Sequence, residues 1–285
     1  MNIKKYINLQ EKSWENLSYS VRGNGIWKIP SMLTHSEKKM LSYLTEFIYE
    51  GEGKILDLGC FLGGSTAFLA HGLTKNINSS GAIDSFDLFK LGKYELNNFF
   101  PRNNLTPPPN LDSEDMFLEY IAPFRSIVNV HKGNILDFKH DSSKIEILFI
   151  DIMKSTKIYD KVVKEFFLHL IPSKSIIIFQ DYYFNKSGVW HHVLVHKLRD
   201  KLKKVADTNI NSNIFVCIEK ISNEEIQNCL WENISYNDKI ESVFFALENC
   251  ESKEQQEILK AILQTTLENE NENKGLEYNF LYKKK

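Results

Sequence analysis

The segment from Lys54 to Gly64 constrains the fold more than any other part of this chain. It consists of a short apolar run, KILDLGC, followed by a glycine-rich turn, and it continues into the helical sequence GGSTAFLAHGLTK. A second run of strand length, GAIDSFDLF, comes next. Strand, glycine turn, helix and strand in this order are typical of a doubly wound parallel sheet. We therefore predict an α/β fold with a mostly parallel sheet.

The second half of the chain repeats this pattern. KIEILFID and SIIIFQD are strand-like and flank a helix whose apolar positions fall on one face. A further helix is expected from about Val189 to Lys203, and it is followed by the extended runs VADTN and NIFVCIEK. Two short runs separated by polar residues favour an antiparallel hairpin that closes the sheet.

The flanks of this core differ from it in pattern. We expect a helical N-terminal cap over residues 1–50, a core over 51–220 and a helical C-terminal extension over 221–285. The extension has amphipathic runs around Ile240–Leu247 and Ile258–Leu267, and we expect its end at ENENENKG to be frayed. Contact with a second copy of the chain is a candidate role for the extension. Within the core, the segment FFPRNNLTPPPN is too rich in proline for regular structure, and it is either a lid over a site or a surface excursion.

Composition limits the classes of function. A hydrophobic content of 42% and a charged content of 25% over 285 residues are those of a folded globular protein. The net charge of -2 provides no field that would gather nucleic acid or an anionic membrane, and the basic run HKLRDKLKK is expected to be the solvated face of a helix. No apolar run has signal-peptide or membrane-spanning length, so we expect no membrane insertion and a cytoplasmic protein. Four scattered cysteines predict neither a disulfide framework nor a zinc site.

The glycine-rich turn is the first place to look for a ligand, since open parallel sheets bind ligands outside the carboxyl ends of their strands. A dinucleotide site requires the spacing G-x-G-x-x-G, but the position two residues after Gly59 is Phe61. A P-loop requires Gly-Lys-Ser/Thr, which does not follow. A phosphate cradle is therefore disfavoured.

The turn D-x-G-x-x-x-G-G-S instead resembles motif I of the class I S-adenosylmethionine-dependent methyltransferases, whose fold is Rossmann-like. The resemblance extends over roughly Gly51 to Lys220. It implies that S-adenosylmethionine is the cofactor and that the turn closes on its methionyl part. The residues implied at this position are Asp57, Gly59, Phe61, Gly63 and Ser65.

The same resemblance implies two further contacts with the cofactor. A carboxylate at the end of the next strand would accept hydrogen bonds from the ribose hydroxyls; Asp87 occupies this place, Asp84 is the reserve candidate, and a turn or helix cap is the other role open to Asp87. In VHKGNILDF, Gly133-Asn134 stands where the family usually has Gly-Asp. Asn134 keeps a carbonyl acceptor for the adenine amine, although a plain Gly-Asn turn is also open.

The segments FIDIMKS and IIIFQDYY resemble the macrocin O-methyltransferase branch and, more distantly, catechol O-methyltransferase. This resemblance implies methylation of a hydroxyl on a small-molecule acceptor, a sugar or sugar nucleotide, assisted by Mg²⁺. Asp151, Gln180 and Asp181 match the implied ligand positions, with Gln180 standing where an aspartate is expected. The alternative is that both aspartates are capping or cofactor-proximal residues without a metal.

Three residues are candidates for the general base. Lys154 matches the D-x-x-K pattern of the catechol enzyme, but a lysine acts as a base only where its pKa is lowered. His191 and His192 titrate closer to neutral pH, and as neighbours on a helix they cannot face the same way. For each histidine, a packed or exposed residue without a catalytic role is the competing interpretation.

The acceptor itself is not specified by the sequence. Aromatic residues near the expected mouth could stack on a sugar or belong to the core; these are Phe99, Phe100, Tyr182, Tyr183 and Trp190. Two rival functions stay open. One is methylation of a phenolic or polyketide acceptor, and the other is a methyltransferase fold kept for binding without catalysis, which the departure at Gln180 would permit.

Overall fold

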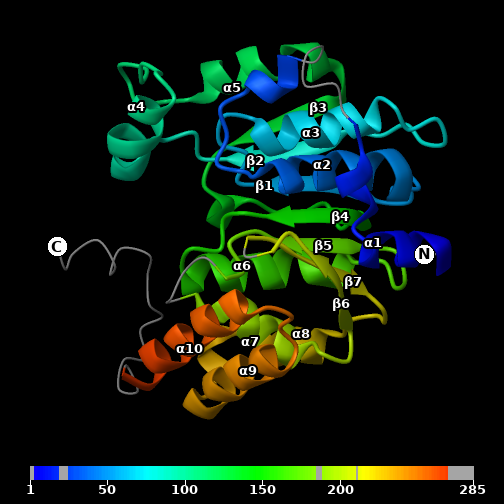
Figure 1. Ribbon diagram of the computed structural model, residues 1–285, viewed down its shortest axis with the longest axis vertical. Coiled ribbons are helices and arrows are strands. Elements are labelled where there is room, and N and C mark those ends of the chain that lie inside the picture. The colour runs from blue at the N-terminus through cyan, green and yellow to red at the C-terminus, as the bar shows by residue number, and fades with distance from the viewer. Residues whose placement is uncertain (1–2, 19–24, 184–187, 210, 269–285) are drawn as a thin grey trace. The chain divides into compact units, whose positions relative to one another are not determined.

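The computed structural model describes residues 3–18, 25–183, 188–209 and 211–268 of the chain (Figure 1). The chain divides into two compact units, residues 2–138 and residues 139–285. Over the described residues the strands form a seven-stranded sheet in the order β3-β2-β1-β4-β5-β7-β6. The division into cap, core and extension at residues 50 and 220 stays a prediction, as does the fraying at ENENENKG, which lies outside the described residues from residue 269 onward.

Residues 2–138 contain parallel strands covered by helices (Figure 1). The strands are β1 (Lys54–Leu58), β2 (Ile83–Asp87) and β3 (Val128–Lys132). The α-helices are α1 (Ile3–Gln10), α2 (His35–Tyr43), α3 (Gly64–Leu73), α4 (Phe100–Arg102) and α5 (Glu114–Tyr120). The 3₁₀ helices are η1 (Ser13–Asn16), η2 (Gly25–Lys28), η5 (Ala122–Ile127) and η6 (Ile135–Asp137), and the π-helices are η3 (Leu44–Ile48) and η4 (Glu95–Phe99).

Residues 139–285 contain a parallel pair of strands, β4 and β5, extended by an antiparallel hairpin. The strands are β4 (Ile145–Ile150), β5 (Ile176–Phe179), β6 (Leu202–Asp207) and β7 (Asn213–Cys217). The α-helices are α6 (Thr156–Phe166), α7 (Val189–Lys197), α8 (Asn223–Cys229), α9 (Tyr236–Glu248) and α10 (Lys253–Glu268), and the 3₁₀ helices are η7 (Phe167–His169) and η8 (Trp231–Asn233).

The strand composition explains this sheet. Strands of a parallel sheet are covered on both faces and are therefore continuously apolar. In β4 and β5 all residues are buried, and all except Glu146 are apolar, as the runs IEILFI and IIIF show. The α/β fold, the antiparallel closing strand and the helices on both flanks of the core are all confirmed. None of the helices within the described part of the chain is long and apolar enough to cross a membrane.

One expected helix boundary is wrong. The helix that begins at Val189 ends at Lys197, and Leu202–Asp207 is the edge strand β6. Residues Leu202 to Asp207 pair with β7, and the hydrogen bonds of this pairing outweigh the helical spacing of Leu198 and Leu202. The basic run HKLRDKLKK is therefore shared between a helix end and a strand and is not one helix face.

The proline-rich excursion is partly regular, contrary to the prediction. Its first residues, Phe99 to Arg102, lie in η4 and α4, which follow each other without a break, and Pro101 lies at the end of this helical stretch, where its missing N–H removes a single hydrogen bond. A bridge between Lys90 and Asp112 closes the excursion at its base. The excursion is therefore a defined loop with its own helical turn.

The helical extension is attached to the sheet by a polar contact. Helices α9 and α10 pack together (Figure 1), and α9 packs on α7. The side-chain amide of Gln255 donates to the Asn209 carbonyl at 2.8 Å and lies 3.4 Å from Asp207 Oδ2 at the end of β6. Gln255 is buried, so these bonds satisfy an amide that would otherwise destabilise the fold.

Candidate functional site

The glycine-rich turn between β1 and α3 has a backbone that few residues adopt. Gly59, Phe61 and Gly63 all have positive φ, at 96°, 46° and 88°. A Cβ at Gly63 would lie 2.8 Å from Ile121 Cγ2, so both the backbone angle and the available space require glycine there. The amide of Gly59 donates to the Phe86 carbonyl of β2 at 2.8 Å. The turn is therefore fixed against the end of the neighbouring strand.

Asp57 lies inside the protein and braces this turn. Its carboxylate accepts hydrogen bonds from Ser65 Oγ at 2.9 and 3.0 Å and from Thr66 Oγ1, both in the first turn of α3. Burial raises the pKa of Asp57 to about 6, and the two hydroxyl donors partly oppose this rise. The sequence assigns Asp57 and Ser65 to the cofactor; the structure shows them hydrogen-bonded to each other, and a contact of either with a cofactor stays a prediction.

Asp87, at the carboxyl end of β2, connects the turn to the next strand. Its Oδ2 accepts from the Phe61 amide at 2.7 Å, and its Oδ1 accepts from the Phe89 amide at 2.7 Å. Burial raises the pKa of Asp87, while these amide donors oppose the rise. A carboxylate has about four acceptor positions, so two backbone donors leave room for a pair of ligand hydroxyls.

Asp84, the reserve candidate for the ribose contact, is bound by other side chains of the protein. It accepts from Asn129 Nδ2 at 3.0 Å, lies 3.0 Å from His131 Nε2, and forms an ion pair with Lys54 at 3.3 Å. Burial alone would raise the pKa of Asp84, but the contacts with His131, Asn129 and Lys54 together lower it. This network lies on the strands themselves and favours Asp87 as the ligand-binding carboxylate.

Asn134 is exposed and caps a short helix. Its Oδ1 accepts from the Leu136 amide at 3.1 Å, which is the geometry of the simple Gly-Asn turn. The preceding residue, Gly133, donates its amide to the Asp87 carbonyl at 3.0 Å. The turn after β3 is thus adjacent to Asp87, and a contact of Asn134 with adenine stays a prediction.

The proline-rich excursion packs on the glycine-rich turn. Phe61 contacts Phe99 edge to face, with ring centroids 5.0 Å apart. Leu62, Leu91, Phe99 and Phe100 form a buried cluster with Phe61 at its margin. The two phenylalanines of the excursion are therefore core residues. Tyr182, Tyr183 and Trp190 are buried as well, at 4%, 2% and 1% exposure, so the core alternative holds for all five aromatics.

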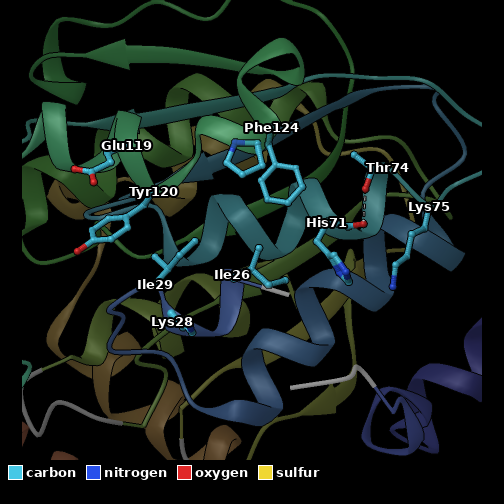
Figure 2. A pocket seen from close by; sticks show the side chains of 11 residues that line it. Ile26, Lys28, Ile29, His71, Thr74, Lys75, Glu119, Tyr120 and Phe124 are labelled. Carbon is cyan, nitrogen blue, oxygen red and sulfur yellow. Dashed lines mark hydrogen bonds between the residues drawn. The ribbon is translucent and has the colours of Figure 1, made fainter. Parts of the chain in front are cut away.

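A groove of about 650 Å³ lies within residues 2–138, along the C-terminal half of α3 (Figure 2). Its walls come from η2, the end of α3 and the α5–η5 segment, and none of the sequence-predicted site residues lines it. Burial, followed by the charge of Lys75, lowers the pKa of His71 in its wall to about 4. This histidine is thus neutral at physiological pH.

The second group of candidates lies in residues 139–285, directly after two adjacent strands. Asp151 follows β4, and Asp181 follows β5. The Lys154 ammonium bridges them, 3.0 Å from Asp151 Oδ1 and hydrogen-bonded to Asp181 Oδ2. Burial alone would lower the pKa of Lys154, but the two carboxylates raise it well above its usual value. Lys154 is therefore a cation here and is unsuited to accept a proton.

Several buried polar atoms close to these carboxylates in the sequence lack hydrogen-bond partners among the described residues. They are Gln180 Oε1, Trp190 Nε1, and both ring nitrogens of His191 and of His192. All four side chains are at most 6% exposed. An unpaired buried polar atom costs roughly 1–3 kcal/mol. The arrangement would therefore be stabilised by a ligand or water that forms these bonds.

The two histidines differ in their surroundings. Burial lowers the pKa of His191 far below its usual value, and the charges of His192 and Lys154 lower it further. Burial lowers the pKa of His192 to about 3, and its ring packs 4.5 Å from that of Tyr182. Both are neutral at physiological pH, but the charge of Lys154 contributes to the shift of His191 only.

The predicted Mg²⁺ ligands do not fit a divalent cation as they are arranged. The carboxylates of Asp151 and Asp181 are both bound to Lys154, and an ion between them would lie against its ammonium group. Gln180 Oε1 is an unpaired acceptor but brings no negative charge. No group of three or more His, Cys, Asp or Glu residues within the described ranges is arranged to hold a metal ion.

Two contacts of the site were not predicted from the sequence. Thr66 donates to Asp57 beside Ser65, a role that the hydroxyl pair at the start of α3 could have suggested. The bond of Lys154 to Asp181 spans 27 residues, and no local pattern indicates it.

Comparisons with known proteins give a structural likeness and no sequence match. No protein family and no curated protein sequence matches the chain. The O-methyltransferase NovP is 12% identical with a TM-score of 0.49, covering 76% of this chain and 98% of its own. CalS11, a TDP-rhamnose 3'-O-methyltransferase, is 12% identical with a TM-score of 0.46, covering 76% and 95%. An O-methyltransferase from Bacillus cereus in complex with SAH is 16% identical with a TM-score of 0.43, covering 77% and 92%. At this level of similarity, the function has to be inferred from the chain's own residues.

Proposed function

We propose that this chain is an S-adenosylmethionine-dependent O-methyltransferase whose acceptor is a hydroxyl group of a sugar or sugar nucleotide. The observation that supports this most is the position of Asp87. Its carboxylate is held by the backbone amide of Phe61, in the glycine-rich turn, and keeps acceptor capacity for two hydroxyls. Paired ribose hydroxyls are the groups that such a carboxylate binds best.

The residues around the turn fit the cofactor. Gly59 has no side chain, so a ligand can approach the backbone of the turn closely there. At Gly63 the missing side chain instead makes room for Ile121 and Phe117, which pack against the turn. Asp57 holds the start of α3 in place through Ser65 and Thr66. Asn134, on the turn next to Asp87, offers an acceptor and a donor for adenine. In this proposal Asp87 binds the ribose.

When bound, S-adenosylmethionine supplies a methyl group on a sulfonium; the acceptor oxygen forms the new O–C bond while the S–C bond breaks and its electron pair returns to sulfur. The acceptor hydroxyl must also lose its proton to a base. Such a base typically contributes ~10²–10⁴-fold to the rate. The side chains of residues 139–285 supply this group in our proposal.

We assign the base role to His191. Lys154 is protonated and bound to two carboxylates, so it has no free electron pair to offer. His191 and His192 are both neutral and so can accept a proton. The charge of Lys154 lowers the pKa of His191 only, which indicates that His191 is the nearer of the two to the cluster, although the same charge makes it a weaker base. Both nitrogens of His191 lack a partner among the described residues, so one can accept the proton. The proton that leaves the hydroxyl thus ends on the His191 imidazole.

The Mg²⁺ assistance expected from the sequence is not a step of this mechanism. It would require Lys154 to leave Asp151 and Asp181 so that both carboxylates and Gln180 could face an ion. Mg²⁺ accepts such oxygen ligands and keeps several waters. Turnover measured in excess EDTA tests it directly, because a metal-assisted enzyme loses activity there.

Calorimetric titration with S-adenosylhomocysteine tests the cofactor assignment. We expect micromolar binding by the wild-type protein and an affinity reduced by about 100-fold, roughly 2.7 kcal/mol, in Asp87→Ala. Asp115→Ala is the matched control, since Asp115 is an exposed acidic residue of α5 in the same unit. Absence of binding by the wild-type protein, or equal affinity in Asp87→Ala, would refute the proposal for this site.

An acceptor screen tests the substrate class. The protein is incubated with S-adenosylmethionine and either sugar nucleotides or vicinal phenolic diols, and methylated product is measured by mass spectrometry. Methylated sugar supports the proposal, and methylated phenol supports the alternative. Cofactor binding without product from either set would favour a binding protein that keeps the fold.

A further inference from the structure

We propose that the Lys154 ammonium is itself the cation of the acceptor site: it occupies the place between Asp151 and Asp181 where a divalent ion would bind, and it holds the acceptor hydroxyl for a metal-independent methyl transfer. This inference rests on the proposed function for its catalytic part. The placement of the ammonium is independent of it, because the contacts of Lys154 are present without any ligand.

The backbone fixes both ends of this ion cluster. Asp181 has φ of 60°, in the left-handed region that is uncommon for residues other than glycine. The residue before it donates its amide to the Ile150 carbonyl at 3.0 Å, and the residue after it donates to the Asn211 carbonyl at 2.8 Å. The backbone that carries Asp181 is therefore held on both sides.

The lysine is held in a similar way. Its amide donates to the Ile152 carbonyl at 2.7 Å, and the next residue, Ser155, caps α6 by accepting from the Ile158 amide. Lys154 thus projects from a short, bonded loop between β4 and α6. The backbone that carries Lys154 is therefore ordered without a ligand, and only the rotamer freedom of its side chain is lost when it binds the carboxylates.

The lysine competes with a divalent ion for the same two carboxylates. The two carboxylates present two negative charges, and the ammonium neutralises one of them at close range. A metal ion would have to displace a cation that is part of the chain, and Gln180 adds an amide where a third carboxylate would have helped the metal. A tethered cation also needs no metal in the medium.

The site leaves the lysine accessible to a ligand. The Lys154 side chain is 31% exposed, compared with 25% for Asp151 and 19% for Asp181. An ammonium in this position donates a hydrogen bond to the acceptor oxygen and stabilises the negative charge that develops as the proton passes to His191. Lys154 stays protonated throughout, so no proton is gained or lost by the cluster.

Binding of Mn²⁺, followed by electron paramagnetic resonance of the free ion, tests the placement without any substrate. We expect the wild-type protein and the control variant Lys157→Ala to bind Mn²⁺ only weakly. Lys157 is an exposed lysine three residues further on, in α6. In Lys154→Ala, the unmasked carboxylate pair should bind Mn²⁺ at least about tenfold more tightly.

Turnover tests the catalytic part. Wild-type activity should be unchanged in EDTA, and Lys154→Ala should lose about 10²–10³-fold in kcat with its affinity for S-adenosylhomocysteine retained. Tight Mn²⁺ binding by the wild-type protein, loss of its activity in EDTA, or full activity in Lys154→Ala would overturn the inference.

Separate measurements cover an unfolded Lys154→Ala variant and a failure of the proposed function. If Lys154→Ala does not fold, as judged by circular dichroism, the Mn²⁺ and EDTA measurements on the wild-type protein still decide between the lysine and a metal. Failure of the proposed function shows as a loss of S-adenosylhomocysteine binding, which is measured separately and does not depend on Mn²⁺.

Discussion

The glycine-rich turn and the Asp151–Lys154–Asp181 cluster both follow parallel strands, but they satisfy their charges in opposite ways. In the turn, Asp57 and Asp87 accept hydrogen bonds from hydroxyls and backbone amides. In the cluster, two carboxylates are bound by one lysine. Gln180 Oε1, next to Asp181 in the chain, is buried and has no hydrogen-bond partner among the described residues. Both sites are thus formed without a ligand, but only the second is accompanied by buried polar atoms that a ligand or water could still satisfy.

The largest expected effect concerns the second site. His191→Asn should reduce kcat by about 10³-fold, because it removes the group that takes the proton from the acceptor. His192→Asn is the matched variant, since it changes the neighbouring buried histidine, and it should cost less than about tenfold. Steady-state kinetics with saturating cofactor measures both, with circular dichroism as the check on folding. Equal losses in the two variants would assign the effect to packing.

Asp57, which braces the glycine-rich turn, should make the free energy of unfolding depend on pH. Because burial raises the pKa of Asp57 from 3.8 to about 6, the folded protein keeps a proton that the unfolded chain releases between these values. The contribution to stability is present below about pH 4 and is lost as the pH rises through 6, by about 3 kcal/mol. Asp57→Asn should lack this decline. Urea unfolding from pH 4 to 7 compares the two, and parallel profiles would contradict the buried carboxylate.

The preformed backbone of the turn can be tested by adding one carbon atom. Gly63→Ala should lower the free energy of unfolding by about 2 kcal/mol, because of the left-handed backbone and the approach of its Cβ to Ile121. Gly25→Ala is the control, since a Cβ there meets no atom within 4 Å. Thermal unfolding measures both. If the Gly63 variant is as stable as the control, the turn tolerates a side chain at this position and its backbone is not rigidly preformed.

The smallest expected effect is that of removing one hydroxyl that donates to Asp57. Ser65→Ala removes one donor from the buried Asp57 carboxylate and leaves Thr66 in place. We expect a loss of about 1 kcal/mol in the free energy of unfolding. Thr66→Val, measured in the same urea titration, shows how the two hydroxyls share the role. No change in either variant would mean that the carboxylate is satisfied in another way.

Local patterns in the sequence were sufficient for most of the fold. The alternation of apolar runs and glycine turns places β1, α3 and β2 correctly, because these elements depend on neighbours in the chain. The boundary at Lys197 was wrong because the strand after it is decided by pairing with β7. The helical turn at Pro101 was missed because a proline in the last turn of a helical stretch removes only one hydrogen bond and does not prevent the helix.

The candidate site shows the same limit. That Asp87 ends a strand next to the turn follows from strand length, and the structure places it there. The commitment of Asp84 to Lys54, Asn129 and His131 depends on strand register, which one sequence does not reveal. The contact of Lys154 with Asp181 likewise joins two separate loops. Sequence therefore indicates which residue types follow the strands, and tertiary structure decides which of them are neutralised.

Strand β6 has a consequence for how this molecule behaves among its own copies. An outermost strand exposes unpaired backbone groups to which another chain could add, and positively charged side chains are a common protection against such growth. Lys203 is exposed on β6 and supplies this protection, whereas Lys204 is paired with Asp207 and Glu251. Two copies aligned edge to edge would bring the exposed Lys203 of each copy onto the same sheet. A continuous intermolecular sheet is therefore disfavoured, and self-association through another surface would leave the β6 edge protected from aggregation.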